Sequence, residues 1–479
     1  LPIYETKNIG SNITSGGNLA LSSNNDTLIK GSNVNVDGNA TINTVGDLNI
    51  VSATDSTYSF EARRKKGSFG RRSSSSSTKS STTNIESNIN VAGDMNSNSQ
   101  ENINIIASNL TSGGNINLDA TKAINIVAGQ DTSYSKTERS KKGTTIIKNS
   151  TDIAYNITNV HSDLNANGNI ALTSGTNTNL VGTNLDAGNN IDINAGDEVM
   201  VAAVADESYR YSNSTKTRSM ATIAKYTGIS AALKTAEVIT DAVAFATQPM
   251  TDIGLNAAAP IASGMVNYAQ NLAEGDLNSK TINNVTQTKT YQLAKLNAGN
   301  NLNVTSNNNV NLIGTDIDAV DATISSISGD VNIANVKDSS YNKSTIQKSK
   351  TTMSSLATDV VKNSLLAAST IVTSMNMLQH PDAKKQTVEE NTEAMGQKSQ
   401  KQFTQINSST DETVVASTID VNNLTINSGR DTIITSSDIN TTNNLDLNST
   451  NNTTITSDFE NDSSFTLTEK DRKSTRLNS

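Results

Sequence analysis

Four segments of this 479-residue chain share one internal register. Each opens on a short Gly-Ser-Asn-like stretch, and a tyrosine follows 27 residues later. The opening residues are Gly31, Ala107, Gly182 and Gly314, and the tyrosines are Tyr58, Tyr134, Tyr209 and Tyr341. A fifth copy begins near Ser436 and has Phe465 in the tyrosine's place, after two extra residues. Recurrence at one offset predicts a repeat architecture with these aromatic residues at equivalent places, at the ends of equivalent coils.

Between these landmarks, Ile, Leu and Val alternate with Asn, Asp and Thr, as in "NINL", "NLNV" and "DLNIV". This period of two is typical of strands with one buried face. Strands and turns return after about twenty residues, which is the spacing of β-helix coils. Only 3% of the residues are aromatic and there is no Trp, so the core must be narrow. We predict an all-β fold, a right-handed parallel β-helix (solenoid), with Asn ladders and with Asn in left-handed corners.

Two Ala-rich stretches interrupt the pattern, and both have helical periodicity. In the first, over 220–275, charged residues share one helical face and small or aliphatic residues share the opposite one: Lys234, Glu237 and Asp241 against Ala232, Ala236, Ile239 and Val243. In the second, over 352–379, Val361, Leu365, Ala368, Val372 and Met375 recur at the same spacing. We predict helical insertions packed on the flank of the β-helix. Membrane contact is the alternative for the uncharged stretch 253–273, although its Asn, Pro and Gln make it poorly apolar.

The expected domain order follows from these interruptions. Residues 8–219 hold β-helix repeats 1–3 and are followed by a helical insertion over 220–275. Repeat 4 occupies 276–350, a second helical insertion 351–400, and a truncated repeat 5 occupies 412–470.

The paired "GGN" turns and the "DxSY plus basic" motifs, as in "DSTYSFEARRKKG" and "DTSYSKTERSKKG", carry a family resemblance. Over roughly residues 8–470 the chain resembles the haemagglutinin repeat of two-partner-secretion exoproteins of Gram-negative bacteria. That group holds filamentous haemagglutinin-like adhesins and contact-dependent growth-inhibition proteins. The resemblance implies a secreted filament at the outer-membrane cell surface, exported through an outer-membrane secretion pore partner.

The function expected is therefore a non-enzymatic filamentous segment that acts in adhesion and cell contact, with a receptor or glycan on a host cell or bacterium as its partner. The alternative is a segment of a contact-dependent growth-inhibition protein that aids toxin delivery across the target envelope. A β-helical polysaccharide-degrading enzyme is the third class, and it requires carboxylates converging in a groove.

A basic run follows each Asp-x-Ser/Thr-Tyr motif, although the chain has a net charge of −9. In the first unit it consists of Arg63, Arg64, Lys65, Lys66, Arg71 and Arg72, next to five consecutive serines. We interpret these runs as solvated loops. They either offset the acidic bulk of the filament or form a row of cationic loops that binds anionic envelope or glycan surfaces. Nucleic acid is not expected as a partner, since no aromatic residues interleave with the cations.

No catalytic, cofactor or metal motif stands out. The histidines, His161 and His380, are far apart and are expected at the surface. Asp186, Asp192, Asp316 and Asp318 are interpreted as Asn substitutes at turns. The chain has no Cys, which excludes disulfides and thiolate metal sites.

Both ends of the chain carry expectations of their own. It begins "LPIYETKNIG" without Met or a signal segment, so we expect an internal fragment with its export signal upstream. The last nine residues, "DRKSTRLNS" over 471–479, match nothing in the repeat, and one back-translation reads as a sequencing-library adapter. We expect a translated artefact there and give its basic residues no role; the alternative is a native basic tail.

Overall fold

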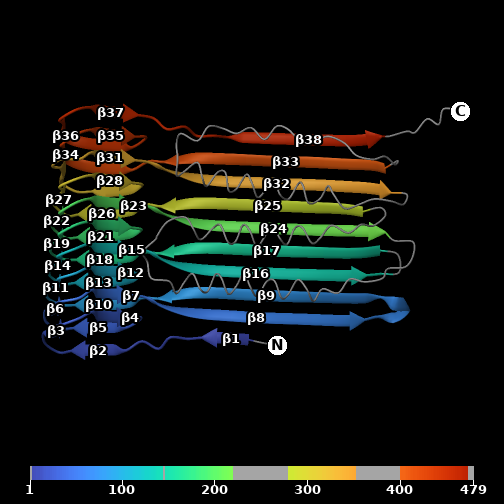
Figure 1. Ribbon diagram of the computed structural model, residues 1–479, viewed down its shortest axis with the longest axis horizontal. Coiled ribbons are helices and arrows are strands. Elements are labelled where there is room, and N and C mark those ends of the chain that lie inside the picture. Colours follow the sequence, from blue (N-terminus) through green and yellow to red (C-terminus); the bar gives the residue numbers. More distant parts are fainter. Residues whose placement is uncertain (1–2, 144–145, 219–278, 352–399, 473–479) are drawn as a thin grey trace.

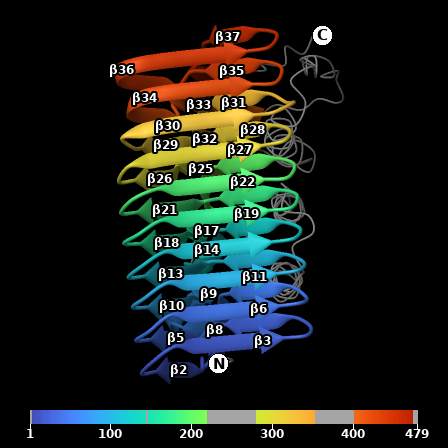
Figure 2. The ribbon, with the colours of Figure 1, turned by 90° about the vertical axis from the view of Figure 1, so that its left-hand side faces the viewer.

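A computed structural model describes residues 3–143, 146–218, 279–351 and 400–472 of the chain. Within these ranges, short strands wind into a stack of coils, one on top of the next (Figure 2). One side of the coil is a 10-stranded parallel sheet, with one strand from each coil. The expected parallel β-helix is therefore confirmed.

Each coil has three strand positions. The first holds β2 (Asn12–Ser15), β5 (Asn33–Val36), β10 (Ser87–Val91), β13 (Ser108–Ser112), β18 (Ser162–Ala166), β21 (Thr183–Ala187), β26 (Ala294–Ala298) and β29 (Thr315–Asp318). The second holds β3 (Leu19–Ser23), β6 (Ala40–Thr44), β11 (Met95–Ser99), β14 (Ile116–Ala120), β19 (Ile170–Ser174), β22 (Ile191–Ala195), β27 (Asn301–Ser306) and β30 (Asp321–Ser326), whereas β34 (Thr418–Ser428) and β36 (Asp438–Ser449) run through both. The third holds β4 (Thr27–Lys30), β7 (Leu48–Val51), β12 (Ile103–Ile106), β15 (Ile124–Val127), β20 (Thr178–Val181), β23 (Val199–Ala202), β28 (Val310–Ile313), β31 (Val331–Ala334), β35 (Thr432–Thr435) and β37 (Thr453–Thr456).

The core is a narrow column of aliphatic side chains, as the alternation predicts. Ile105 pairs with Ile50 of the coil below and with Ile126 of the coil above, and all three are fully buried. Outside the column, amides form ladders: Asn104 Nδ2 donates to Asn49 Oδ1, and Asn125 Nδ2 donates to Asn104 Oδ1, each at 2.9 Å. Stacked small aliphatics therefore supply the core, and the ladders satisfy polar groups between coils.

After every second coil the chain leaves the β-helix in a long antiparallel excursion (Figure 1). These excursions, with one strand at each end of the chain, build a second sheet, here called the hairpin sheet. Its order is β1 (Ile3–Thr6), β8 (Ala53–Lys66), β9 (Arg72–Ile85), β16 (Gly129–Lys142), β17 (Ile146–Val160), β24 (Val204–Arg218), β25 (Ser279–Gln292), β32 (Val336–Thr351), β33 (Gln400–Val415) and β38 (Ser463–Arg472). A short 3-10 turn, η1 (Ser68–Gly70), joins β8 to β9.

The hairpin sheet corrects the sequence-based interpretation of the basic run as a mobile loop. Apart from Arg71, which lies in the turn, that run and the five serines lie in β8 and β9, and these strands pair residue by residue from Ala53 with Ile85 to Lys66 with Arg72. Ser and Thr do not differ enough in hydrophobicity to give the alternating pattern that marks a strand. The backbone N–H and C=O groups of β9 are nevertheless hydrogen-bonded, because a strand pairs with it on each side.

The residues that open each repeat have left-handed backbone angles. Gly31, Gly182 and Gly314 have φ of 53°, 60° and 63°, Ala107 has φ of 43° and Ser436 has φ of 40°. Among the described residues, Ala107 and Ser436 are the non-glycine positions with positive φ, so the prediction of left-handed Asn corners is wrong. The corner Asn side chains instead accept backbone N–H groups of the next coil, as Asn39 Oδ1 does from Asp94.

The two expected helical insertions fall almost wholly on 219–278 and 352–399, outside the described residues. The same holds for His380 and for residues 473–479. Within the described residues, β38 continues to Arg472 in backbone pairing with Lys401.

Candidate functional site

The repeat-marking tyrosines lie inside hairpin strands and not at the ends of coils. Each is the sixth residue of its strand: Tyr58 in β8, Tyr134 in β16, Tyr209 in β24 and Tyr341 in β32. The pairing runs from Tyr58 through Ser80 to Tyr134, Tyr155 and Tyr209, so these side chains stand on one face of the sheet. We call it the tyrosine face. Phe465 also lies on it, in β38 opposite Ser408.

The aspartate of each Asp-x-Ser/Thr-Tyr motif ties its hairpin to the preceding strand. Asp131 Oδ1 accepts the backbone N–H of Asn84 at 2.6 Å and its side-chain amide at 2.9 Å. Asp206 repeats both contacts with Asn159, at 2.7 and 3.1 Å. Asp55 and Asp338 bind the backbone N–H groups of Asn8 and Tyr291 in the same way. The motif therefore anchors the root of each hairpin.

The six basic residues of the first unit are divided between the two faces of the hairpin sheet. Arg64, Lys66 and Arg72 have the strand parity of Tyr58 and belong to the tyrosine face, whereas Arg63 and Lys65 belong to the opposite face. Arg71 lies in the turn, where it caps η1. Arg63 also forms an ion pair with Glu61. The structure therefore does not gather the predicted set into one site.

Lys65 instead belongs to a row of lysines that crosses the sheet near the tips of the hairpins. The pairing runs Lys65, Ser73, Lys141, Lys148, Lys216, Lys280, Lys348, Phe403 and Lys470, with each residue directly opposite the next. We call the seven lysines of this series the lysine row, and the face that carries them the lysine face. All seven are exposed.

This arrangement is electrostatically unfavourable for the isolated sheet. Five consecutive strands, from β16 to β32, place a lysine opposite a lysine. Adjacent strands are about 4.8 Å apart, and like charges directly opposite each other destabilise a sheet. Among the described residues, no carboxylate lies within ion-pair distance of the row. Lys348 contacts the Phe403 ring, with its Nζ 5.0 Å from the ring centre.

Sequence analysis expected a row of cationic loops but named residues only in the first unit, so it missed six members of the lysine row. A signal was present: Lys65, Lys141, Lys216 and Lys348 each lie ten residues beyond the motif aspartate. The lysines of the return strands, Lys148 and Lys280, have no such marker. Only the antiparallel register places them in the row.

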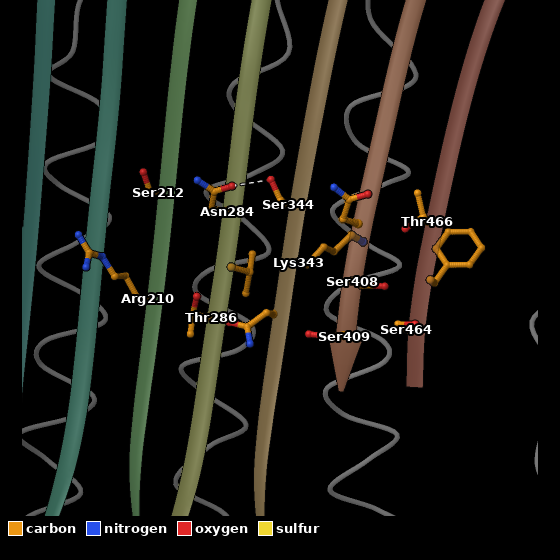
Figure 3. A pocket seen from close by; sticks show the side chains of 14 residues that line it. Arg210, Ser212, Asn284, Thr286, Lys343, Ser344, Ser408, Ser409, Ser464 and Thr466 are labelled. Carbon is orange, nitrogen blue, oxygen red and sulfur yellow. Dashed lines mark hydrogen bonds between the residues drawn. The ribbon is translucent and has the colours of Figure 1, made fainter. Parts of the chain in front are cut away.

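A shallow hollow of about 660 Å³ lies across β24, β25, β32, β33 and β38, and most of the residues around it belong to the lysine face (Figure 3). Its lining is mainly Ser, Thr and Asn, with Arg210 at one side. Ser344 donates to Asn284 within it at 2.8 Å. None of the described lining residues is Asp or Glu, whereas glycoside hydrolysis ordinarily uses two carboxylates. The hollow therefore offers hydroxyl and amide groups for contact.

The four aspartates that were expected at turns lie in coil strands instead, Asp186 in β21, Asp192 in β22, and Asp316 and Asp318 in β29, so that expectation is wrong. Three of them accept hydrogen bonds from the next coil. Asp186 accepts from Asn297 at 2.9 Å, Asp192 accepts from Asn303 at 2.7 Å, and Asp316 accepts from Thr418 at 2.7 Å. His161 is partly buried, with its Nε2 2.6 Å from Gln292 Oε1. Within the described ranges, no group of His, Asp and Glu is arranged to hold a metal ion.

Burial changes the acid–base behaviour of the tyrosine face. It raises the pKa of Tyr134 to about 12, with smaller contributions from the charge of Glu138 and from Tyr58. Burial and the charge of Glu207 raise the pKa of Tyr155 to about 12. The pKa of Tyr209 is also raised, chiefly by burial.

No described helix has the length and apolarity that crossing a bilayer needs.

Comparison with known families identifies the repeat. The hemagglutinin repeat family matches three times, over residues 4–68, 67–154 and 148–239. Residues 4–239 of the chain belong to the hemagglutinin repeat family. Each of the first two matches begins in or beside a hairpin strand and takes in coils of the β-helix, and coils of the same form continue through β37. The resemblance to the haemagglutinin-repeat region of two-partner-secretion exoproteins is thereby confirmed. No curated protein and no solved structure matches the chain.

Proposed function

We propose that this segment is a non-enzymatic part of a secreted, surface-displayed filament, and that the lysine row attaches it to anionic groups on another surface. The family supports a filamentous adhesin-like segment, and through it a transporter partner for secretion. The β-helix supplies length and stiffness, because every coil pairs with the next along the stack. The hairpin sheet stands off this stack on one side (Figure 1).

The lysine row is the observation that carries the proposal. Backbone pairing holds these lysines in register. The conformational entropy of their backbone is therefore lost when the sheet folds and not when a partner binds. A partner with a line of phosphate, sulfate or carboxylate groups relieves the repulsion between neighbouring ammonium groups as it binds. The hydroxyl and amide side chains around the hollow can hydrogen-bond the neutral parts of a glycan. We therefore favour an anionic glycan of a cell envelope, on a host cell or on a neighbouring bacterium.

The test measures binding of the purified protein to immobilised anionic and neutral polysaccharides and to whole cells. One variant changes Lys141, Lys148, Lys216 and Lys280 to Gln. The matched control changes four exposed lysines elsewhere, Lys7, Lys30, Lys122 and Lys295, to Gln and removes the same charge.

Loss of at least about tenfold in affinity is expected only for the variant of the row, and wild-type binding should weaken as salt rises. Equal losses in both variants would show attraction by net charge alone and would reject the lysine row as the site. Binding of the wild type to neutral polysaccharide with the same affinity would reject it too.

A further inference from the structure

The lysine face carries charges of opposite sign at its two ends. The lysine row lies near the tips of the hairpins, and the aspartates of the Asp-x-Ser/Thr-Tyr motifs lie at the roots, where the hairpins leave the coils. In β8, β16, β24 and β32 the aspartate is the third residue of the strand and a lysine of the row is the thirteenth. The two are ten residues apart, an even number, so their side chains stand on the same face. We call these four partly exposed carboxylates the aspartate row: Asp55, Asp131, Asp206 and Asp338.

The aspartate row finds no counter-charge in the part of the chain that the structure describes. The Oδ1 atoms of Asp131 and Asp206 accept the backbone N–H groups of Asn84 and Asn159. Asp206 Oδ2 accepts from the side-chain amide of Gln292 at 2.6 Å. These donors are neutral, and none of the ion pairs between described residues includes an aspartate of this row or a lysine of the lysine row. Both rows therefore leave uncompensated charge on one face of the sheet.

The two rows are placed symmetrically about the middle of the strands. β24 has 15 residues, so its third and thirteenth residues, Asp206 and Lys216, are equally far from its two ends. Figure 1 shows the hairpin strands running side by side across the direction in which the coils stack. A half-turn about an axis along the stack, through the middle of the strands, therefore exchanges the positions of the two rows. Such a two-fold axis makes one face complementary to itself.

We propose that two copies of this chain pack with their lysine faces together, related by this two-fold axis. The lysine row of each copy then lies over the aspartate row of the other. Because the axis follows the stack, each strand meets the same strand of the second copy: Lys141 faces the partner's Asp131, and Lys216 faces the partner's Asp206. This inference does not rest on the proposed adhesive function, and a glycan and a second copy would compete for the lysine row.

The lysines of the return strands fit the same arrangement. Lys148 is the third residue of β17 and Thr158 is the thirteenth, so the two-fold axis places Lys148 over the partner's Thr158. Thr158 pairs with Asp131 of the adjacent strand. Lys148 therefore lies within about one strand spacing, about 4.8 Å, of the position above the partner's Asp131. Lysines of outgoing and return strands thus share the same carboxylates.

The surface between the two rows allows a close approach. Ser212, Asn284 and Ser344 lie on it, in three neighbouring strands (Figure 3). Short side chains of this kind allow two sheets to pack about 10 Å apart. Arg210 is placed over the partner's Ser212, next to the partner's Asp152, because Asp152 pairs with Ser212. The arrangement therefore supplies a carboxylate for this arginine as well.

The face is large enough for a stable dimer. The eight strands from β8 to β33 in the described sheet have 14 to 16 residues each. With about 4.8 Å between strands and about 3.4 Å per residue, they cover roughly 1,800 Å². A stable interface buries about 800 Å² on each partner. About half of this face is therefore sufficient.

Because the chain has no Cys, single cysteines can report the arrangement. Lys148→Cys and Thr158→Cys are made in separate copies of the chain, and both positions are exposed on the lysine face. Within one copy they are about 34 Å apart, at about 3.4 Å per residue, whereas the two-fold axis brings them together across the interface. Oxidation of the mixture at low salt should give at least about tenfold more disulfide-linked dimer than oxidation of either variant alone.

Asn156→Cys is the control for register, since it is exposed on the same face and displaced along β17 by about 7 Å. It should cross-link less with Lys148→Cys than Thr158→Cys does. Equal yields at positions 156 and 158 would overturn the inference. Cross-linking of Lys148→Cys with itself at the yield of the mixture would place like rows together and would overturn it too.

Sedimentation velocity separates this interface from glycan binding. The wild-type chain should self-associate at low salt and dissociate as salt rises. Asp131→Asn with Asp206→Asn keeps an oxygen acceptor at each root and removes two charges, so the Kd of self-association should rise at least about tenfold. The lysine row is unchanged in this variant, so binding to an immobilised anionic polysaccharide should persist.

A wild-type chain that stays monomeric at low salt would reject the paired faces. So would self-association of the Asn variant with the wild-type Kd. Neither result bears on the adhesive proposal, which fails only if the lysine row does not bind anionic polysaccharide. Circular dichroism of each variant checks that the sheets remain folded.

Discussion

The Cβ of Ala107 lies 2.7 Å from the point where a Cβ on Gly129 would stand. At the equivalent place in the first repeat the two residue types are exchanged: Gly31 opens the turn, and Ala53 begins the hairpin with its Cβ 2.5 Å from the Cβ position of Gly31. Gly182 is matched in the same way with Val204. One side chain fits at each junction between coil and hairpin, and either partner can supply it.

This relationship predicts a compensated pair of substitutions. Gly129→Ala should destabilise its junction by about 1–3 kcal/mol, because two methyl groups cannot occupy the same space. Adding Ala107→Gly should restore stability, since it recreates the first junction and removes a left-handed alanine. Urea unfolding of the two single variants and the double variant measures the coupling. Additive effects of the two changes would contradict the packing argument.

The contact between Asp131 and Asn84 predicts a local effect at the root of a hairpin. Asp131→Ala removes the acceptor of two hydrogen bonds, so the Asn84 amide should exchange with solvent about tenfold faster or more. Hydrogen exchange resolved by NMR or mass spectrometry measures this rate. Asp119→Ala, an exposed change in β14, is the control and should leave the rate unchanged.

The narrow core predicts strong position dependence within one strand. Ile193 is fully buried, and Ile193→Asp should cost at least about 3 kcal/mol, because the column offers no partner for a charge. Ile50→Asp should act in the same way in the second coil. The neighbouring change Asn194→Asp, at an exposed position of β22, should be nearly neutral. Limited proteolysis compares the variants, and equal resistance of Ile193→Asp and wild type would count against the β-helix.

The coils could be predicted from sequence because burial in them alternates strictly, as in "IDINA" of β22. The hairpin strands could not, because runs such as Ser73–Ser77 in β9 carry no contrast between faces. Their pairing depends on backbone groups and on neighbours far along the chain, as between Ser80 and Tyr134. The motif tyrosines were visible in sequence, but their strands extend well past the point where hydrophobic alternation ends.

The candidate site shows the same division between local and long-range information. Lys65 and Lys141 follow their motif aspartates at one offset, which a single sequence can reveal. The contribution of Lys148 and Lys280 depends on where each return strand pairs, and the register across β17 and β25 decides that.

The buried tyrosines predict a transition in alkali. Because Tyr134 and Tyr155 have their pKa raised to about 12 in the folded sheet, against about 10 in the unfolded chain, the folded state holds their protons more tightly. Their contribution to stability is therefore complete below pH 10, and it declines as pH rises from about 10 to about 12. The hairpin sheet should loosen in that window.

The titration can be followed by tyrosinate absorbance and by circular dichroism. A variant with Tyr134→Phe and Tyr155→Phe has no phenol to ionise at these positions, so its hairpin sheet should persist to higher pH than that of the wild type. Val285→Ile, a change on the same face that leaves every phenol in place, is the control and should keep the wild-type transition. If the Phe variant and the wild type lose structure at the same pH, then ionisation of these tyrosines does not control the transition.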